Sequence, residues 1–177
     1  MKRRTLLQGA GAFMASAVAA PSLVRAEAAA TLRFIPQQDL VTLDPVTTFA
    51  YITRNHGYMV FDTLYGMDGA FRATPQMVEG HRIEEDGRRW DLSLREGLRF
   101  HDGAPVLARD CVASLRRWAR RDPFGGSLME ATDELSAASD RDVVFRLRRP
   151  FPLLPAALGK TGTSMPCIMP ELSLIHI

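Results

Sequence analysis

The sequence holds few residues whose types and spacing could support catalysis. His56, His81 and His101 fall in separate parts of the chain. His101 precedes Asp102, and a histidine oriented by a carboxylate is an arrangement used in general-base catalysis. Because Asp102 is followed by Gly103, and Asp-Gly is a turn sequence, we interpret the pair as turn chemistry. Neither the Gly-x-Ser-x-Gly of hydrolases nor the His-Glu-x-x-His of zinc peptidases occurs, so we predict no catalytic residue.

Two further patterns give no site. Gly159-Lys160-Thr161-Gly162 has the residue types of a phosphate-binding loop but not the spacing of the Walker motif. The chain has two cysteines, Cys111 and Cys167, too few for a four-cysteine metal site. We expect both to be small buried residues, with a disulfide between them as the alternative. We therefore predict no metal and no cofactor.

The composition is that of a globular protein. Of the 177 residues, 46% are hydrophobic and 24% are charged. The formal charge of +2 does not indicate nucleic-acid binding, and removing residues 1–26 would leave 18 basic and 20 acidic side chains. All basic side chains are arginine except Lys2 and Lys160, which we interpret as the codon bias of a GC-rich bacterial genome.

Residues 1–26 have the plan of an export signal. A basic start precedes an apolar run over residues 6–20, and a small-residue end follows. We place the cleavage site after Ala26, with Ala28 as the alternative. The run is shorter than the about 20 residues that span a membrane. Arg3-Arg4-Thr5-Leu6-Leu7 indicates the twin-arginine route, with the general secretory route as the alternative. No second apolar stretch predicts membrane insertion of the mature chain, so we expect a periplasmic protein from a Gram-negative bacterium.

Residues 172–177, Leu-Ser-Leu-Ile-His-Ile, match the translated end of a common sequencing adapter. We interpret them as an artefact, with a genuine apolar end as the alternative. On this interpretation the natural sequence stops near Glu171, and residues 27–171 are the N-terminal part of a longer solute-binding domain. We expect that part alone to fold poorly and to bind no peptide.

Apolar spacing predicts the elements that position these residues. Residues 31–35 read as a strand and residues 36–45 as a loop. The pattern over residues 49–64 predicts a helix with Ile52, Met59 and Val60 on one face. A second helix is expected over residues 107–121, with Val112, Leu115 and Trp118 buried and a solvated arginine face. We expect residues 123–126 to end it and a short helix to form over residues 152–158.

Three Asp-Gly pairs predict hairpin turns, at Asp68, Asp86 and Asp102. The middle turn should join residues 82–85 to residues 88–95. Trp90, Leu92 and Leu94 alternate with polar residues in the second arm, as in a strand with one buried face. A strand element over residues 98–100 follows, and another hairpin is expected from residues 134–138 and 143–147.

Several motifs in order resemble one protein family. The longest is Trp90-Asp91-Leu92-Ser93-Leu94-Arg95-Glu96-Gly97-Leu98-Arg99-Phe100-His101-Asp102-Gly103. Leu43-Asp44-Pro45 and Phe61-Asp62-Thr63-Leu64 precede it, and Ala108-Arg109-Asp110-Cys111-Val112 follows. Together they are similar to the dipeptide, oligopeptide and nickel-binding proteins, family five of the extracellular solute-binding proteins of ABC transporters.

The resemblance implies a fold and a function. The fold would be α/β, of the type II periplasmic-binding-protein kind with two lobes, of which this chain represents only the first lobe and its additional subdomain. The protein would capture peptides or similar small solutes and deliver them to a membrane permease, as a monomer and without enzymatic activity. The alternative is the precursor of a secreted hydrolase, either a peptidase or an esterase.

The resemblance also nominates ligand-binding residues. In relatives the stretch after Leu43-Asp44-Pro45 faces the cleft, and weaker candidates come from loops that approach it. The candidates are Thr47, Thr48, Phe49, Tyr51, Phe124 and Thr163. Alternatively, Phe49 and Tyr51 are core aromatic residues of the first helix. Residues 160–165 include no arginine for an anionic metal chelate, which argues against nickel transport.

Overall fold

The computed structural model describes residues 33–174. The chain divides into two units, residues 1–35 and 36–177, and all helices and strands described here belong to the second. The predicted export signal, residues 1–26, and residues 175–177 of the suspected adapter segment lie outside the described residues. The predicted strand over residues 31–35 is wrong in its described part. Residues 33–35 form no strand, because no described strand pairs with them, and Ile35 is exposed.

The largest element is an antiparallel sheet of four strands in the order β3-β4-β6-β5. The strands are β3 (Val78–Glu84), β4 (Arg89–Leu94), β5 (Thr132–Ala137) and β6 (Asp142–Leu147). Both predicted hairpins are confirmed. The first turns through the short helix η1 (Glu85–Gly87), in which Asp86 and Gly87 have the positive φ that an Asp-Gly turn favours.

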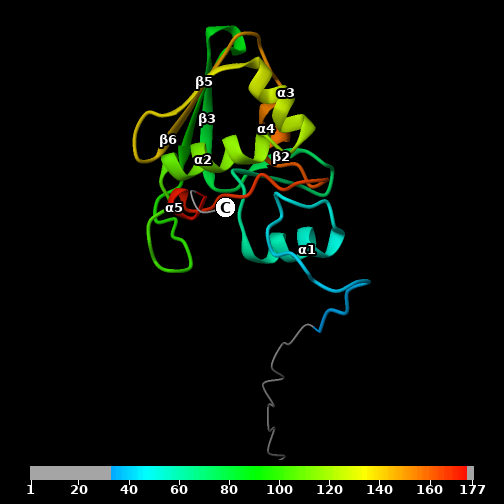
Figure 1. Ribbon diagram of the computed structural model, residues 1–177. Coiled ribbons are helices and arrows are strands. Elements are labelled where there is room, and N and C mark those ends of the chain that lie inside the picture. Colours follow the sequence, from blue (N-terminus) through cyan, green and yellow to red (C-terminus); the bar gives the residue numbers. More distant parts are fainter. Residues whose placement is uncertain (1–32, 175–177) are drawn as a thin grey trace, which may run out of the picture. The chain divides into compact units, whose positions relative to one another are not determined.

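One face of this sheet is the core. Trp90, Leu92 and Leu94 of β4 are buried, while the residues between them are half-buried, as the alternation predicts. Helix α2 (Ala108–Ala119) contacts β5 and β6 and crosses in front of the sheet in Figure 1. Its Leu115 and Trp118 are almost fully buried, so the predicted buried face is confirmed. Of the arginines expected on a solvated face, Arg109 and Arg116 are exposed, whereas Arg117 is only 18% exposed because it pairs with Asp44.

A smaller sheet pairs β1 (Tyr65–Met67) with β2 (Ala73–Pro75). The predicted turn at Asp68 is confirmed, although it is longer than two residues and Phe71, not Gly69, has the positive φ. The Asp68 carboxylate accepts hydrogen bonds from the backbone N–H groups of Ala70 and Arg72, which fixes the turn. Residues 98–100 contribute one isolated bridge instead of the predicted strand.

Helix α1 (Tyr51–Val60) is shorter than predicted and buries a different face. Ile52 is buried as expected, but Met59 and Val60 are exposed. The buried positions are instead Thr53, whose hydroxyl donates to the Thr42 carbonyl, and Gly57. The face is chosen by packing against the loop before the helix, so the apolar spacing was misleading here.

Three short helices complete the described fold. They are α3 (Pro123–Ala131), α4 (Leu154–Leu158) and α5 (Glu171–Leu174). The prediction that residues 123–126 end the second helix is wrong: α2 already ends at Ala119, and residues 123–126 form the first turn of α3, which the sequence did not predict. The predicted short helix over residues 152–158 is confirmed as α4, whose Leu154 and Leu158 are fully buried.

Both cysteines are free and buried, which confirms the first interpretation of Cys111 and Cys167. Burial raises the pKa of each thiol to about 12, so both are protonated and inert at neutral pH. None of the helices in the described part of the chain is long and apolar enough to cross a bilayer.

Candidate functional site

The loop before α1 carries the first four candidate residues. Thr47, Phe49 and Tyr51 are exposed and Thr48 is half-buried. The Thr47 hydroxyl donates to the Asp44 carbonyl at 3.1 Å, and the Thr48 hydroxyl accepts from the Ala50 N–H at 3.2 Å. These local bonds fix the chain direction just before the helix begins.

The alternative that Phe49 and Tyr51 are core aromatic residues is wrong. Their exposed fractions are 58% and 59%. The Arg54 guanidinium lies 4.6 Å from the centre of the Tyr51 ring, a cation–π contact on the outer surface of α1. Both rings are therefore available for contact with another molecule.

Asp44 anchors this loop to α2. Its carboxylate accepts hydrogen bonds from both terminal nitrogens of the Arg117 guanidinium and from the Val46 N–H. Burial would raise the pKa of Asp44, but the hydrogen bonds from Arg117 and Val46 and the charges of Arg117 and Arg121 outweigh it and hold that pKa below its ordinary value. The aspartate of Leu43-Asp44-Pro45 thus has a positioning role.

The other two candidates meet at Asp122, whose side chain is fully buried at the start of α3. One carboxylate oxygen accepts from the Phe124 N–H at 2.9 Å. The other accepts from the Thr163 hydroxyl at 2.7 Å and the Lys160 ammonium at 2.6 Å. Phe124 itself is half-buried, with its ring centre 6.1 Å from that of Phe151.

Ser164 joins these two groups of candidates. Its hydroxyl donates to the Val46 carbonyl at 3.1 Å, and the next residue, Met165, donates its N–H to Pro45. The segment that carries Thr163 therefore lies beside the loop that carries Thr47. The sequence analysis missed Tyr58, which is exposed on α1 and donates its hydroxyl to the Lys160 carbonyl at 2.7 Å. Its place on the same helix face as Tyr51 was the available signal.

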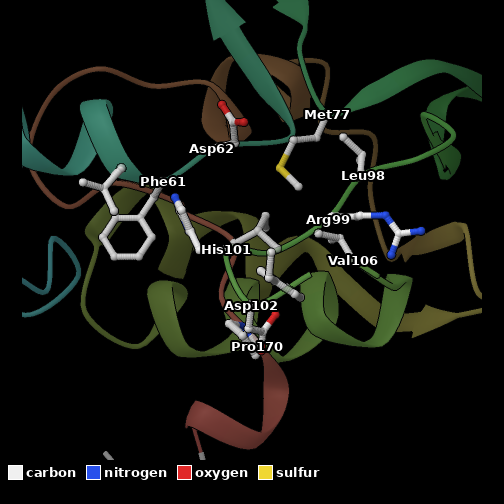
Figure 2. Close-up of a pocket in the computed structure, with 12 residues that line it drawn as sticks. Phe61, Asp62, Met77, Leu98, Arg99, His101, Asp102, Val106 and Pro170 are labelled. Atoms are coloured by element: carbon white, nitrogen blue, oxygen red, sulfur yellow. The ribbon is translucent and has the colours of Figure 1, made fainter. Parts of the chain in front are cut away.

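A hollow of about 290 Å³ lies elsewhere, between the end of α1, the residue before β3 and the loop after β4 (Figure 2). Its lining is mostly apolar, with Phe61, Met77 and Leu98 among the labelled side chains. His101 and Asp102 stand at this hollow, but the Asp102 carboxylate accepts from the Ala104 N–H of its own turn at 2.9 Å. This supports the interpretation of the pair as turn chemistry.

A second hollow, of about 410 Å³, is lined by arginines of α2 and the residues after it. Thr47 and Val46 form one side of it. Arg117 is held there by Asp44, and Arg116 donates to the Leu135 carbonyl at 2.8 Å. Within residues 33–174, no cluster of three or more histidine, cysteine or acidic side chains could hold a metal ion.

The sequence matches one family model. Residues 72–168 match the bacterial extracellular solute-binding proteins, family 5, middle region. A probable peptide ABC transporter periplasmic-binding protein of Sinorhizobium fredii is 38% identical over 175 residues, which cover 97% of this chain and 32% of that protein. A probable deoxycholate-binding periplasmic protein of Escherichia coli is 31% identical, over 71% of this chain and 26% of that protein.

The fold agrees with this assignment. A solute-binding protein of A. tumefaciens R10, solved with mannopinic acid, superimposes with a TM-score of 0.68 at 23% identity, covering 78% of this chain and 29% of that structure. The predicted α/β fold of the type II periplasmic binding proteins is thereby confirmed. This chain spans about a third or less of the length of the relatives it matches. The chain belongs to the bacterial extracellular solute-binding proteins of family 5.

Proposed function

We propose that the protein carrying this chain is the substrate-binding component of an ABC importer, which captures peptides or similar small solutes and delivers them to a membrane permease. The family match over residues 72–168 is the observation that carries the proposal. The relatives support it, since they include a probable peptide-binding and a probable deoxycholate-binding periplasmic protein.

On this chain the ligand surface would consist of the six candidate residues, which are Thr47, Thr48, Phe49, Tyr51, Phe124 and Thr163. The exposed rings of Phe49 and Tyr51 support contact with the apolar groups of a solute such as a peptide. The exposed residues Thr47 and Thr163 add hydroxyls beside them. No metal or cofactor takes part in this proposal.

The proposed mechanism is closure of two lobes around the solute, with no chemical reaction. A solute that touches two lobes binds the closed state better than the open state and shifts the population toward it. The closed protein then docks on the permease, and no bond of the solute is broken. The family is one of solute-binding proteins and not of enzymes, which supports the absence of enzymatic activity.

The location follows from the same proposal. The relatives are named as periplasmic proteins, and residues 1–26 have the plan of an export signal. We place the mature protein in the periplasm of a Gram-negative bacterium, as a monomer that is not inserted in the membrane. The alternative, a secreted hydrolase, has no supporting observation, since no hydrogen bond joins His101 to Asp102 and no metal cluster occurs among the described residues.

A thermal-shift screen of the whole protein that carries this chain tests the proposal, with trialanine, glutathione and deoxycholate as probes. A ligand at a hundred times its Kd stabilises the native state by about 2.7 kcal/mol, which raises the melting temperature. Mass spectrometry should recover the stabilising solute unchanged. A solute that is consumed instead would favour the hydrolase.

Two aromatic residues provide a matched pair for the location of the site. Phe49→Ala should abolish the shift, whereas Phe71→Ala should leave it intact. Phe71 is also exposed, at 81%, but it stands in the turn between β1 and β2, outside the proposed ligand surface. Equal losses in the two variants would contradict the assignment of the surface.

A further inference from the structure

Asp122 uses its two carboxylate oxygens for two different tasks. Oδ1 accepts from the N–H groups of Phe124 and Gly125, at 2.9 and 3.2 Å, and so caps α3. Oδ2 accepts from Lys160 and Thr163, at 2.6 and 2.7 Å. The cap requires only the first oxygen. The second oxygen holds a segment that lies about forty residues further along the chain.

Lys160 is buried to an unusual degree for a lysine. Its side chain is 14% exposed, and its ammonium donates to both Asp122 and the Thr163 hydroxyl. Burial of a lysine is costly unless the charge is paired, which the carboxylate provides here. The Lys160 carbonyl accepts from Tyr58, so the same residue is also tied to α1.

The residues after Lys160 are fixed at their far end. The Trp118 indole N–H donates to the Ser164 carbonyl at 3.2 Å, and the Ser164 hydroxyl donates to Val46. Between these two anchors, residues 161–163 are exposed. Thr163 has φ of 53°, a conformation that β-branched residues avoid, so its contacts must hold it there.

We infer that Lys160 and Asp122 are positioning residues, which, through the Thr163 hydroxyl, hold residues 161–163 in one conformation beside Phe124. The inference rests on the proposed function in one respect, since it assigns this segment to the ligand surface. Ordering the segment before the solute arrives lowers the entropic cost of binding. The network itself would exist whatever the solute is.

The lysine content of the chain permits a direct test. Lys160 is the only lysine of the described part, so a protease specific for lysine cuts that part at one place, and mass spectrometry of the whole protein that carries this chain identifies the fragment ending at Lys160. Cleavage of the native protein requires local opening of the segment, and its rate reports the population of the open form. Thr163→Val removes the hydroxyl at nearly constant volume, whereas Thr163→Ser retains the hydroxyl. Thr161→Val is the matched control, because no hydrogen bond of the Thr161 side chain occurs among the described contacts.

We expect Thr163→Val to accelerate cleavage after Lys160 by roughly tenfold, the effect of losing a hydrogen bond to a charged group. Thr163→Ser and Thr161→Val should stay within about twofold of the unchanged chain. The melting temperature should be similar in all four proteins, which separates local opening from global unfolding. Equal cleavage rates for Thr163→Val and Thr161→Val would overturn the inference.

Asp122→Asn provides a second route to the same answer. Asparagine retains the cap on α3 but loses the charge that pairs with Lys160. Faster cleavage after Lys160 with α3 intact by circular dichroism supports the inference, and an unchanged rate overturns it.

A thermal-shift measurement with trialanine on the whole protein that carries this chain tests the effect of the segment on binding. Asp122→Asn, a change outside the proposed ligand surface, should weaken the thermal shift, and Phe71→Ala should retain it. If trialanine gives no shift with the unchanged protein, the proposed function fails for this probe, whereas the cleavage rates still decide the role of Lys160.

Discussion

Gly125 of α3 lies directly against the indole ring of Trp118 of α2. A Cβ atom on Gly125 would stand 3.0 Å from two ring carbons of Trp118 and 2.8 Å from the Ala119 Cα. The obstruction is a buried ring and a backbone atom, neither of which can move easily. The neighbouring Gly126 is different, since the nearest atom to its Cβ would be the Ala119 carbonyl oxygen at 3.8 Å.

The two glycines should therefore respond in opposite directions to substitution by alanine. Gly125→Ala forces α2 and α3 apart and should lower the free energy of unfolding by about 2–3 kcal/mol. Gly126→Ala should raise it by about 0.5–1 kcal/mol, because alanine is the better helix former. Guanidinium unfolding measures both, and equal stabilities of the two variants would contradict the close approach.

Trp90→Ala should also destabilise the protein strongly. The side chain is 4% exposed, and its indole N–H donates to the Gly87 carbonyl at 3.1 Å. Truncation leaves a cavity in the core and should lower the free energy of unfolding by about 3–5 kcal/mol. Ile83, its partner in the β3–β4 register, is 46% exposed. Ile83→Ala is the control, with an expected loss of about 1 kcal/mol. A loss below about 1 kcal/mol for Trp90→Ala would show that the core packs differently.

The sheet and α2 could be predicted because their patterns follow from local rules. Trp90, Leu92 and Leu94 alternate with polar residues, and a strand with one buried face requires that alternation. Val112, Leu115 and Trp118 repeat at helical spacing. In both elements the apolar residues are numerous enough to define the buried face without knowledge of its partner.

The buried face of α1 and the existence of α3 could not be predicted in this way. Gly57 is buried in α1 because its missing side chain makes room for Pro45, and that contact depends on the loop path. Gly125 and Gly126 disfavour a helix locally, but Asp122 caps it and Pro123 suits its first turn. The close packing of α3 against Trp118 of α2 then requires glycine at position 125.

The candidate ligand residues also show that contacts set by the tertiary fold cannot be predicted from a local motif. The family motif led to Thr47, Phe49 and Tyr51 through the loop that follows it. Tyr58 and Lys160 were missed, because their roles depend on a contact between α1 and a segment about a hundred residues later. A motif identifies the segment that carries a site, whereas the partners that hold it come from the tertiary fold.

Stability should fall in acid. Ser139 and Ser93 lower the pKa of Asp142 through hydrogen bonds. For Asp44 and Asp122 burial acts in the opposite direction, but the hydrogen bonds from Arg117 and Lys160 outweigh it, so the pKa is again lowered. A carboxyl group whose pKa is lower in the folded state binds fewer protons there than in the unfolded state. Its contribution is therefore present above the unfolded value of about 3.9 and is lost as the pH falls through the folded value.

We therefore expect the free energy of unfolding to change little between about pH 7 and pH 5 and to decline below about pH 4. Urea unfolding at a series of pH values measures this, and Asp44→Asn should make the acid decline shallower. Stability that rises on acidification would contradict the assigned ion pairs.

Export should depend on the paired arginines near the start of the chain. We predict that changing Arg3 and Arg4 together to lysine stops export of the gene product, because the apolar run that follows is weak and the pair fits the twin-arginine pattern. Fractionation of cells measures the periplasmic share. Arg25→Lys, a basic change outside the pair, is the control and should leave export intact. Normal periplasmic accumulation of the double variant would favour the general secretory route.

The ion pair between Asp44 and Arg117 should couple the loop before α1 to α2. The side chains are 21% and 18% exposed, and the Asp44 carboxylate also accepts from Val46. Asp44→Ala and Arg117→Ala should each cost about 2–3 kcal/mol, because each leaves a partly buried charge without its partner. The double variant should cost less than the sum, with a coupling energy of about 1–2 kcal/mol.

The same cycle on an exposed pair separates the effect of burial from that of charge. Arg148 and Asp133 approach to 3.4 Å but are 65% and 69% exposed, so their coupling should be below about 0.5 kcal/mol. Since the cycle cancels the loss of the Val46 hydrogen bond, a large value for Asp44 and Arg117 measures the ion pair itself. A value as small as that of the exposed pair would mean that Ser164 and Met165, through Val46 and Pro45, hold the loop instead.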